Sequence, residues 1–158
     1  MRLTIGPNGG PGIRGLGPHL HPGLIEILHC VSGTMRARVG RRVATLPPGE
    51  RLEVPAGVVH GFKNTGNTPL TVNVDIVFTP PGPRPEADLM AIGWAMSGFV
   101  QAGEVSRWTG YPPLLHLAVI EDAHPQAMRQ AGLVGRIMPS LAYLGRLRGY
   151  LPSAVEGA

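Results

Sequence analysis

The sequence predicts a mainly-β fold over residues 1–80, a sandwich or barrel of short strands, followed by a helical extension over residues 81–158. The chain holds 23 Gly and 17 Pro among its 158 residues, and this load is typical of tight turns between strands. Short apolar runs recur between these turns at intervals of about 8–12 residues, as in β-sandwiches and barrels. Beyond the Pro- and Gly-rich segment 79–83, the apolar residues change to helical spacing.

The strands are expected where apolar runs end at turn-forming residues. Residues 1–18 form a Gly- and Pro-rich lead-in with a single short β-segment at residues 3–5. Later runs end at clusters such as Ser32-Gly33 and Pro47-Pro48-Gly49. The further predicted strands cover residues 25–31, 34–39, 42–46, 51–54, 59–63 and 70–78.

Three helices are expected in the extension, over residues 86–101, 113–122 and 134–148. Pro139 should kink or restart the last one, because proline removes a helical hydrogen bond. The apolar faces of these helices need a partner. We expect them to pack on the barrel, cover its mouth or form the interface of a homodimer.

The composition excludes several classes of partner. The net charge is +4, yet the basic residues are scattered and no aromatic residues interleave with them, so nucleic-acid binding is not expected. No apolar run resembles a signal peptide or a membrane span, and we expect a cytoplasmic protein without membrane contact. The single cysteine, Cys30, excludes an internal disulfide bond.

Two short stretches have the residue types and the spacing of a metal site. His19 and His21 stand two residues apart, so that in a strand both imidazoles project from one face. Glu26 follows the Pro22-Gly23 bend, where the chain can return a carboxylate to the histidine pair. His60 opens a later strand after a tight turn and can point to the same place. Three imidazoles and one carboxylate suit a transition metal and leave open positions on an octahedral ion.

The first stretch resembles the first motif of the cupin superfamily, G(x)5HxH(x)3–4E(x)6G. After His19-Leu20-His21, four residues precede Glu26 and six more precede Gly33. One position departs from the motif, because its leading glycine would fall at Ile13. That position belongs to a turn and provides no ligand.

The second stretch resembles the second cupin motif, G(x)5PxG(x)2H(x)3N. Gly49 is followed by five residues, then by Pro55-Ala56-Gly57, His60 and, after three more residues, Asn64. The spacer of 15 residues between Gly33 and Gly49 is similar to the short spacer of small microbial cupins. The resemblance covers about residues 13–78.

Membership of this superfamily implies a jelly-roll barrel, or double-stranded β-helix, with a metal inside it near one mouth. By residue-to-residue match, the ligands would be His19, His21, Glu26 and His60. They would hold one divalent transition metal per chain, which could be Fe, Mn, Ni, Cu or Zn. Glu26 would also be catalytic, either by leaving the metal or as a general base, as the matching glutamate is thought to act in flavonol dioxygenase-type cupins.

Strand parity predicts an apolar pocket around this metal. The residues expected to contact a substrate are Leu28, Met35, Phe62, Val74 and Ile76. His29 is expected on the surface, with a role beside the ligands as the alternative.

Three functions remain open for such a site. The favoured one is an oxygenase that acts on a small, fairly apolar substrate of enol, diketone-like or phenolic type. The second is a non-redox metalloenzyme, an isomerase, lyase or hydrolase, in which Glu26 or His29 moves protons. The third is a barrel that binds a small molecule without turnover.

Overall fold

The computed structural model describes residues 1–7, 15–79, 86–106 and 110–152. The strands are β1 (Arg2–Ile5), β2 (Gly15–Leu20), β3 (Leu24–Ser32), β4 (Met35–Val39), β5 (Arg42–Leu46), β6 (Arg51–Val54), β7 (His60–Asn64), β8 (Leu70–Phe78) and β9 (Arg129–Gln130). The helices are α1 (Glu86–Ala102), α2 (Leu114–Ala123) and α3 (Gly132–Leu147).

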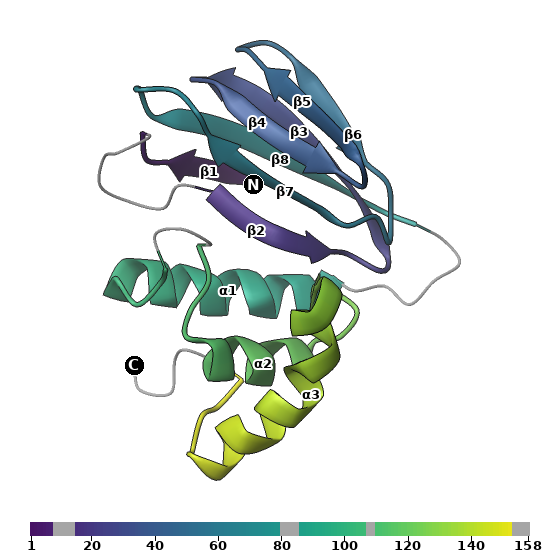
Figure 1. Ribbon diagram of the computed structural model, residues 1–158, viewed down its shortest axis with the longest axis vertical. Coiled ribbons are helices and arrows are strands. Elements are labelled where there is room, and N and C mark those ends of the chain that lie inside the picture. Colours follow the sequence, from purple (N-terminus) through teal and green to yellow (C-terminus); the bar gives the residue numbers. More distant parts are fainter. Residues whose placement is uncertain (8–14, 80–85, 107–109, 153–158) are drawn as a thin grey trace.

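Two antiparallel sheets form the jelly-roll, and the helices gather on one side of it, next to β2 (Figure 1). The four-stranded sheet has the order β1-β8-β3-β6, and the five-stranded sheet has the order β5-β4-β7-β2-β9. The expectation of a mainly-β fold followed by C-terminal helices is confirmed. The boundary predicted near residue 80 falls within residues 80–85, outside the described part of the chain.

Two strands differ from the prediction. The lead-in 1–18 was expected to hold one β-segment, but β2 begins at Gly15 and reaches the first ligand histidine. The extension was expected to be helical, but β9 adds a short edge to the five-stranded sheet by pairing with β2. Both segments lack the run of β-branched residues that identifies a strand in sequence, and their pairing depends on distant partners.

A bulge in β2 sets the direction of His19. Leu16 pairs with Phe62 and His19 pairs with His60, so β2 holds one residue more than β7 between these pairs. The extra length falls at Gly17-Pro18, and proline is tolerated at bulges because it has no N–H to donate to the ladder. Gly15 permits the close approach of the two strands, since a Cβ there would lie 2.2 Å from the Phe62 carbonyl oxygen.

The side chains between the sheets form a buried apolar core. Its members alternate along the strands with solvent-facing residues, as on β8, where Val72 and Val74 are buried while Asn73 and Asp75 are exposed. Asn64 closes one end of this core, because its side-chain amide donates to the Ile5, Gly6 and Thr68 carbonyls. The last residue of the second motif therefore fixes a turn and the N-terminal strand.

The helices build a second apolar core against β2. Residues 117–121 of α2 are all buried, between α1 and α3. Leu16 of β2 packs against both cores and joins the helical layer to the sandwich. The helix α3 continues through Pro139 as one element, so it does not restart there, and the kink stays a prediction.

Candidate metal centre

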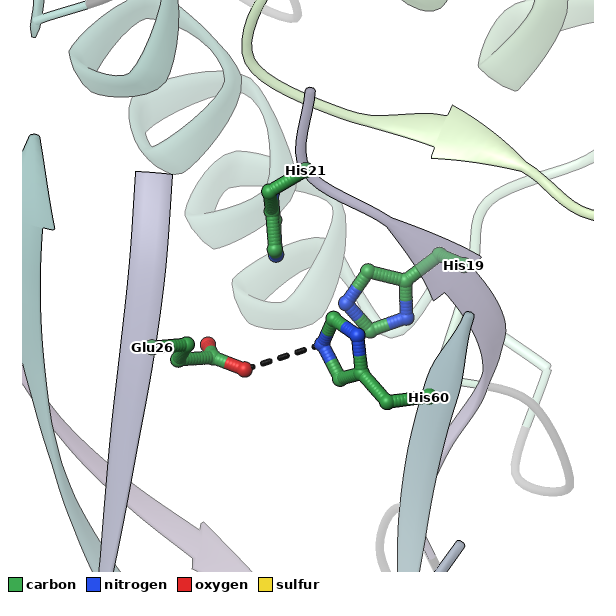
Figure 2. Close-up of side chains that lie close together, drawn as sticks. All are labelled: His19, His21, Glu26 and His60. Carbon is green, nitrogen blue, oxygen red and sulfur yellow. Dashed lines mark ion pairs between the residues drawn. The ribbon is translucent and has the colours of Figure 1, made fainter. Parts of the chain in front are cut away.

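The four predicted ligands come together between the two sheets (Figure 2). His19 and His60 belong to paired strands of the five-stranded sheet, and Glu26 projects from β3 in the other sheet. His21 lies in the connection between β2 and β3, where its carbonyl accepts a hydrogen bond from Gly57 at 2.8 Å. All four side chains are buried, and one ligand atom of each lies within 4.8 Å of the others.

Each histidine is held by its Nδ1 atom. The Nδ1 of His19 lies 2.8 Å from the Gly17 carbonyl oxygen, and that of His60 lies 2.9 Å from the Val58 carbonyl oxygen. The Nδ1 of His21 bonds to the Ala127 carbonyl. Because a carbonyl can only accept, these bonds place a proton on Nδ1 and leave the Nε2 lone pair of every ring available to an ion.

The contact between Glu26 and His60 shows that the centre fits a cation. His60 Nε2 lies 2.9 Å from Glu26 Oε2, yet neither atom has a hydrogen-bond partner of acceptable geometry. When the His60 ring is neutral, its proton is on Nδ1 and its Nε2 lone pair points to the carboxylate, so two acceptors face each other inside the protein. A metal ion bound by both atoms removes this conflict, and unsatisfied buried polar groups often mark such a site.

The environment keeps His19, His21 and Glu26 in the protonation states that metals require. Burial, together with the neighbouring His60 and His21, lowers the pKa of His19 to about 3. Burial also lowers the pKa of His21. Burial alone would raise the pKa of Glu26, but the adjacent His60, followed by the nearby His21 and His19, lowers it on balance. Neutral imidazoles beside an ionised carboxylate are the forms that coordinate a metal.

Sequence reasoning missed two contacts to the ligands from the extension. The Tyr111 hydroxyl lies 2.9 Å from His19 Nδ1 and donates to the Gly17 carbonyl at 3.0 Å. The Ala127 carbonyl is the acceptor for His21. Burial raises the pKa of Tyr111, so this hydroxyl keeps its proton. No local motif surrounds either residue, and only the fold brings them to the barrel.

The residues predicted to contact a substrate lie in the apolar core between the sheets. Leu28, Met35, Phe62 and Val74 are buried there, and the half-buried Ile76 packs against them. Ile76 pairs with Glu26 across β3 and β8, and paired residues share a face of the sheet. Their place in the core is therefore clear, and their contact with a substrate stays a prediction.

His29 lies on the outer face of β3. Its Nε2 atom forms an ion pair with Asp75 at 2.8 Å, and both side chains are exposed. Glu26 faces inward three residues earlier, so the two side chains point to opposite sides of the strand. The expectation of a surface histidine is confirmed, and His29 cannot move protons at this centre.

Three solved structures resemble half of this chain. They are TT1209 from Thermus thermophilus, a predicted oxalate decarboxylase from Thermotoga maritima, and a protein with a double-stranded β-helix domain from Klebsiella pneumoniae. Their identities are 26%, 24% and 23%, and their TM-scores are 0.44, 0.45 and 0.43. The matches cover 50%, 49% and 52% of this chain and 70%, 64% and 67% of the respective structures.

The family comparison identifies the β-domain. No curated protein matches the sequence. The family described as "Cupin domain" matches residues 2–78, which contain all the strands from β1 to β8 and the four candidate ligands. The β-domain of this chain, residues 2–78, therefore belongs to the cupin superfamily.

Proposed function

We propose that the protein is a metal-dependent oxygenase whose substrate is a small, fairly apolar enol, diketone-like or phenolic compound. The observation that carries the proposal is the convergence of three histidines and one glutamate in an apolar interior. Four protein ligands leave positions open on an octahedral ion, which is a feature of catalytic sites. A redox-active ion bound there would act as Lewis acid and bring substrate and oxygen together.

The chain's own residues have separate tasks in this proposal. His19, His21 and His60 would hold the ion through Nε2, because their Nδ1 atoms are already bonded to carbonyl groups. Glu26 is the group that can accept a proton from an enol or phenol, since its carboxylate is ionised at neutral pH. The core residues around Val74 and Ile76 exclude water and favour an apolar substrate body.

The two other functions remain distinct from the first. In a non-redox isomerase or lyase, Glu26 would move a proton without oxygen, and His29 has no part in it because it lies on the outer surface. In a binding module, the same ligand set would hold a metal and a small molecule without turnover. The favoured metals differ too, since zinc would support a non-redox reaction and iron, manganese, nickel or copper an oxygenase.

Oxygen consumption tests the proposal. Chelator-treated protein would be loaded separately with each of the five metals and mixed with pentane-2,4-dione or catechol as simple probes. We expect oxygen uptake that depends on a redox-active metal and is lost in His60→Ala, while the surface variant His29→Ala retains it. Deuterium exchange into the substrate without oxygen uptake would support the isomerase instead. Binding without either reaction would support the binding module.

The oligomeric state and the location of the protein are separate questions from its reaction. A homodimer stays a prediction, which sedimentation of the purified protein would test. No helix in the described residues is long and apolar enough to cross a bilayer. The cytoplasmic location also stays a prediction.

A further inference from the structure

The segments on either side of α2 both reach into the metal centre. Tyr111 stands before the helix and contacts His19, at 2.9 Å from hydroxyl oxygen to Nδ1. Ala127 stands after the helix, and its carbonyl bonds to His21. Two of the three ligand histidines therefore have a partner from the helical extension. His60 has its partner, Val58, within the barrel.

The packing holds these two partners in place. Tyr111, Ala127 and Met128 belong to the same buried core as α2. On the far side of Ala127, Gln130 pairs with His19 through the short ladder between β9 and β2. The extension is thus attached to the ligand strand by backbone pairing as well as by side-chain packing.

An imidazole bound to a metal needs its ring orientation and tautomer fixed by a second hydrogen bond. Loss of such an outer partner typically weakens metal affinity by about 10–100-fold in other proteins. His21 depends entirely on Ala127 among the hydrogen bonds of its ring in the described structure. His19 has two partners, because the Gly17 carbonyl and the Tyr111 hydroxyl both lie within bonding distance of its Nδ1.

We infer that the helical extension forms the outer shell of the metal centre, with Tyr111 as a positioning residue for His19 and the Ala127 carbonyl as the positioning group for His21. The inference rests on the proposed metal site and adds a role for the part of the chain outside the cupin domain. The extension orients two ligands, and none of the four candidate ligands belongs to it.

Cobalt binding tests the role of Tyr111. Chelator-treated wild type, Tyr111→Phe and the control Tyr143→Phe would be titrated with Co²⁺ alone, and affinity and visible absorption would be measured. Phenylalanine keeps the buried ring and removes only the hydroxyl, whereas Tyr143 is 63% exposed on α3. We expect Tyr111→Phe to bind about tenfold more weakly, because Gly17 still holds His19, and to shift the absorption bands. The control should match the wild type.

The outcomes separate this inference from the proposed function. Wild-type affinity together with an unchanged spectrum in Tyr111→Phe would overturn the role of Tyr111 and leave the metal site intact. A wild type that binds no cobalt would overturn the inference and the metal site together.

A measurement on the wild type tests the role of Ala127 without a variant. Proton–nitrogen NMR of the metal-free protein should show His21 with its proton on Nδ1, protected from exchange with solvent. A proton on Nε2 of His21 would overturn the role of the Ala127 carbonyl.

Discussion

His60 Nε2 lies 2.9 Å from Glu26 Oε2 across the space between the two sheets, and neither atom has a hydrogen bond of acceptable geometry. Since His60 bonds to the Val58 carbonyl through Nδ1, the Nε2 of its neutral ring is an acceptor that faces another acceptor. The metal-free protein therefore carries an electrostatic cost at this pair, and a bound cation would turn it into a gain. Removal of the Glu26 charge should therefore raise the stability of the metal-free protein and weaken its binding of metal.

Replacement of Glu26 by Gln should separate these two effects. The amide can donate a hydrogen bond to His60 Nε2, so we expect the metal-free variant to be more stable than wild type by about 1 kcal/mol. The same variant should bind metal more weakly, because a neutral amide replaces a carboxylate ligand. Urea unfolding at pH 8 with chelator, beside a cobalt titration, measures both. A metal-free variant less stable than wild type would contradict the two-acceptor description.

Acid should lower the stability of the metal-free protein at pH values where His19 in the folded chain is still unprotonated. Burial, with the neighbouring His60 and His21, lowers the pKa of His19 to about 3 from 6.5. Between these values the unfolded chain binds a proton that the folded chain does not, so stability falls as the pH drops from 6.5 toward 3. The slope from this residue approaches about 1.4 kcal/mol per pH unit. Unfolding between pH 7 and 4 should be less pH-dependent in His19→Gln, and an equal slope would contradict the prediction.

Glu121 should have the opposite pH dependence. Burial raises its pKa to about 7, against the opposing hydrogen bond from the Gln130 backbone N–H. The folded chain then binds the extra proton between pH 4.5 and 7, so the stability contribution is lost as the pH rises through this range. We expect Glu121→Gln to be more stable than wild type at pH 8 by about 1–3 kcal/mol and equal to it near pH 4.

The neighbour Asp122 provides the control for this comparison, because its carboxylate is exposed and pairs with Arg146 at 2.7 Å. Asp122→Asn should change stability by less than about 1 kcal/mol at either pH. If Glu121→Gln proved no more stable than wild type at pH 8, Glu121 would be ionised in the folded chain at no cost.

Gly15 should resist replacement by any larger residue. An alanine Cβ would lie 2.2 Å from the Phe62 carbonyl oxygen and 2.7 Å from the Lys63 Cα, both in the backbone of β7. Gly15→Ala must push β2 away from β7, and we expect a loss of about 1–3 kcal/mol in unfolding free energy. Metal affinity should fall too, since His19 lies on β2.

The matched control for that substitution is Gly93→Ala in α1, where an added Cβ meets nothing within 4 Å. Alanine in place of an exposed helical glycine should raise stability by about 0.5–1 kcal/mol. Equal effects of the two substitutions would show that β2 and β7 are not packed as described.

Much of the barrel and its ligand set could be predicted because short-range rules govern them. The two-residue period of a strand predicted His19 and His21 on one side, and they do converge although His21 lies just beyond the end of β2; the motif spacing adds Glu26 and His60. The same parity places His29 outside. These relations depend on residues close in sequence or on a recognisable family pattern.

The outer contacts of the site could not be predicted in this way. Tyr111 meets His19 across 92 residues of sequence, and Ala127 meets His21 across 106. Such contacts arise from the packing of the helical layer against β2, and no local pattern encodes them. The strand β2 escaped prediction for a related reason, because Gly15 and the Gly17-Pro18 bulge are useful only beside β7.

The central claim is that the four side chains hold one metal ion, and elemental analysis of the purified protein tests it most directly. Wild type, His60→Ala and the surface control His29→Ala would be measured together, as isolated and after reconstitution with Fe, Mn, Ni, Cu or Zn. The site predicts about one equivalent in the wild type and in His29→Ala, and a large loss in His60→Ala. No metal in any of the three proteins, or a full equivalent retained by His60→Ala, would contradict it.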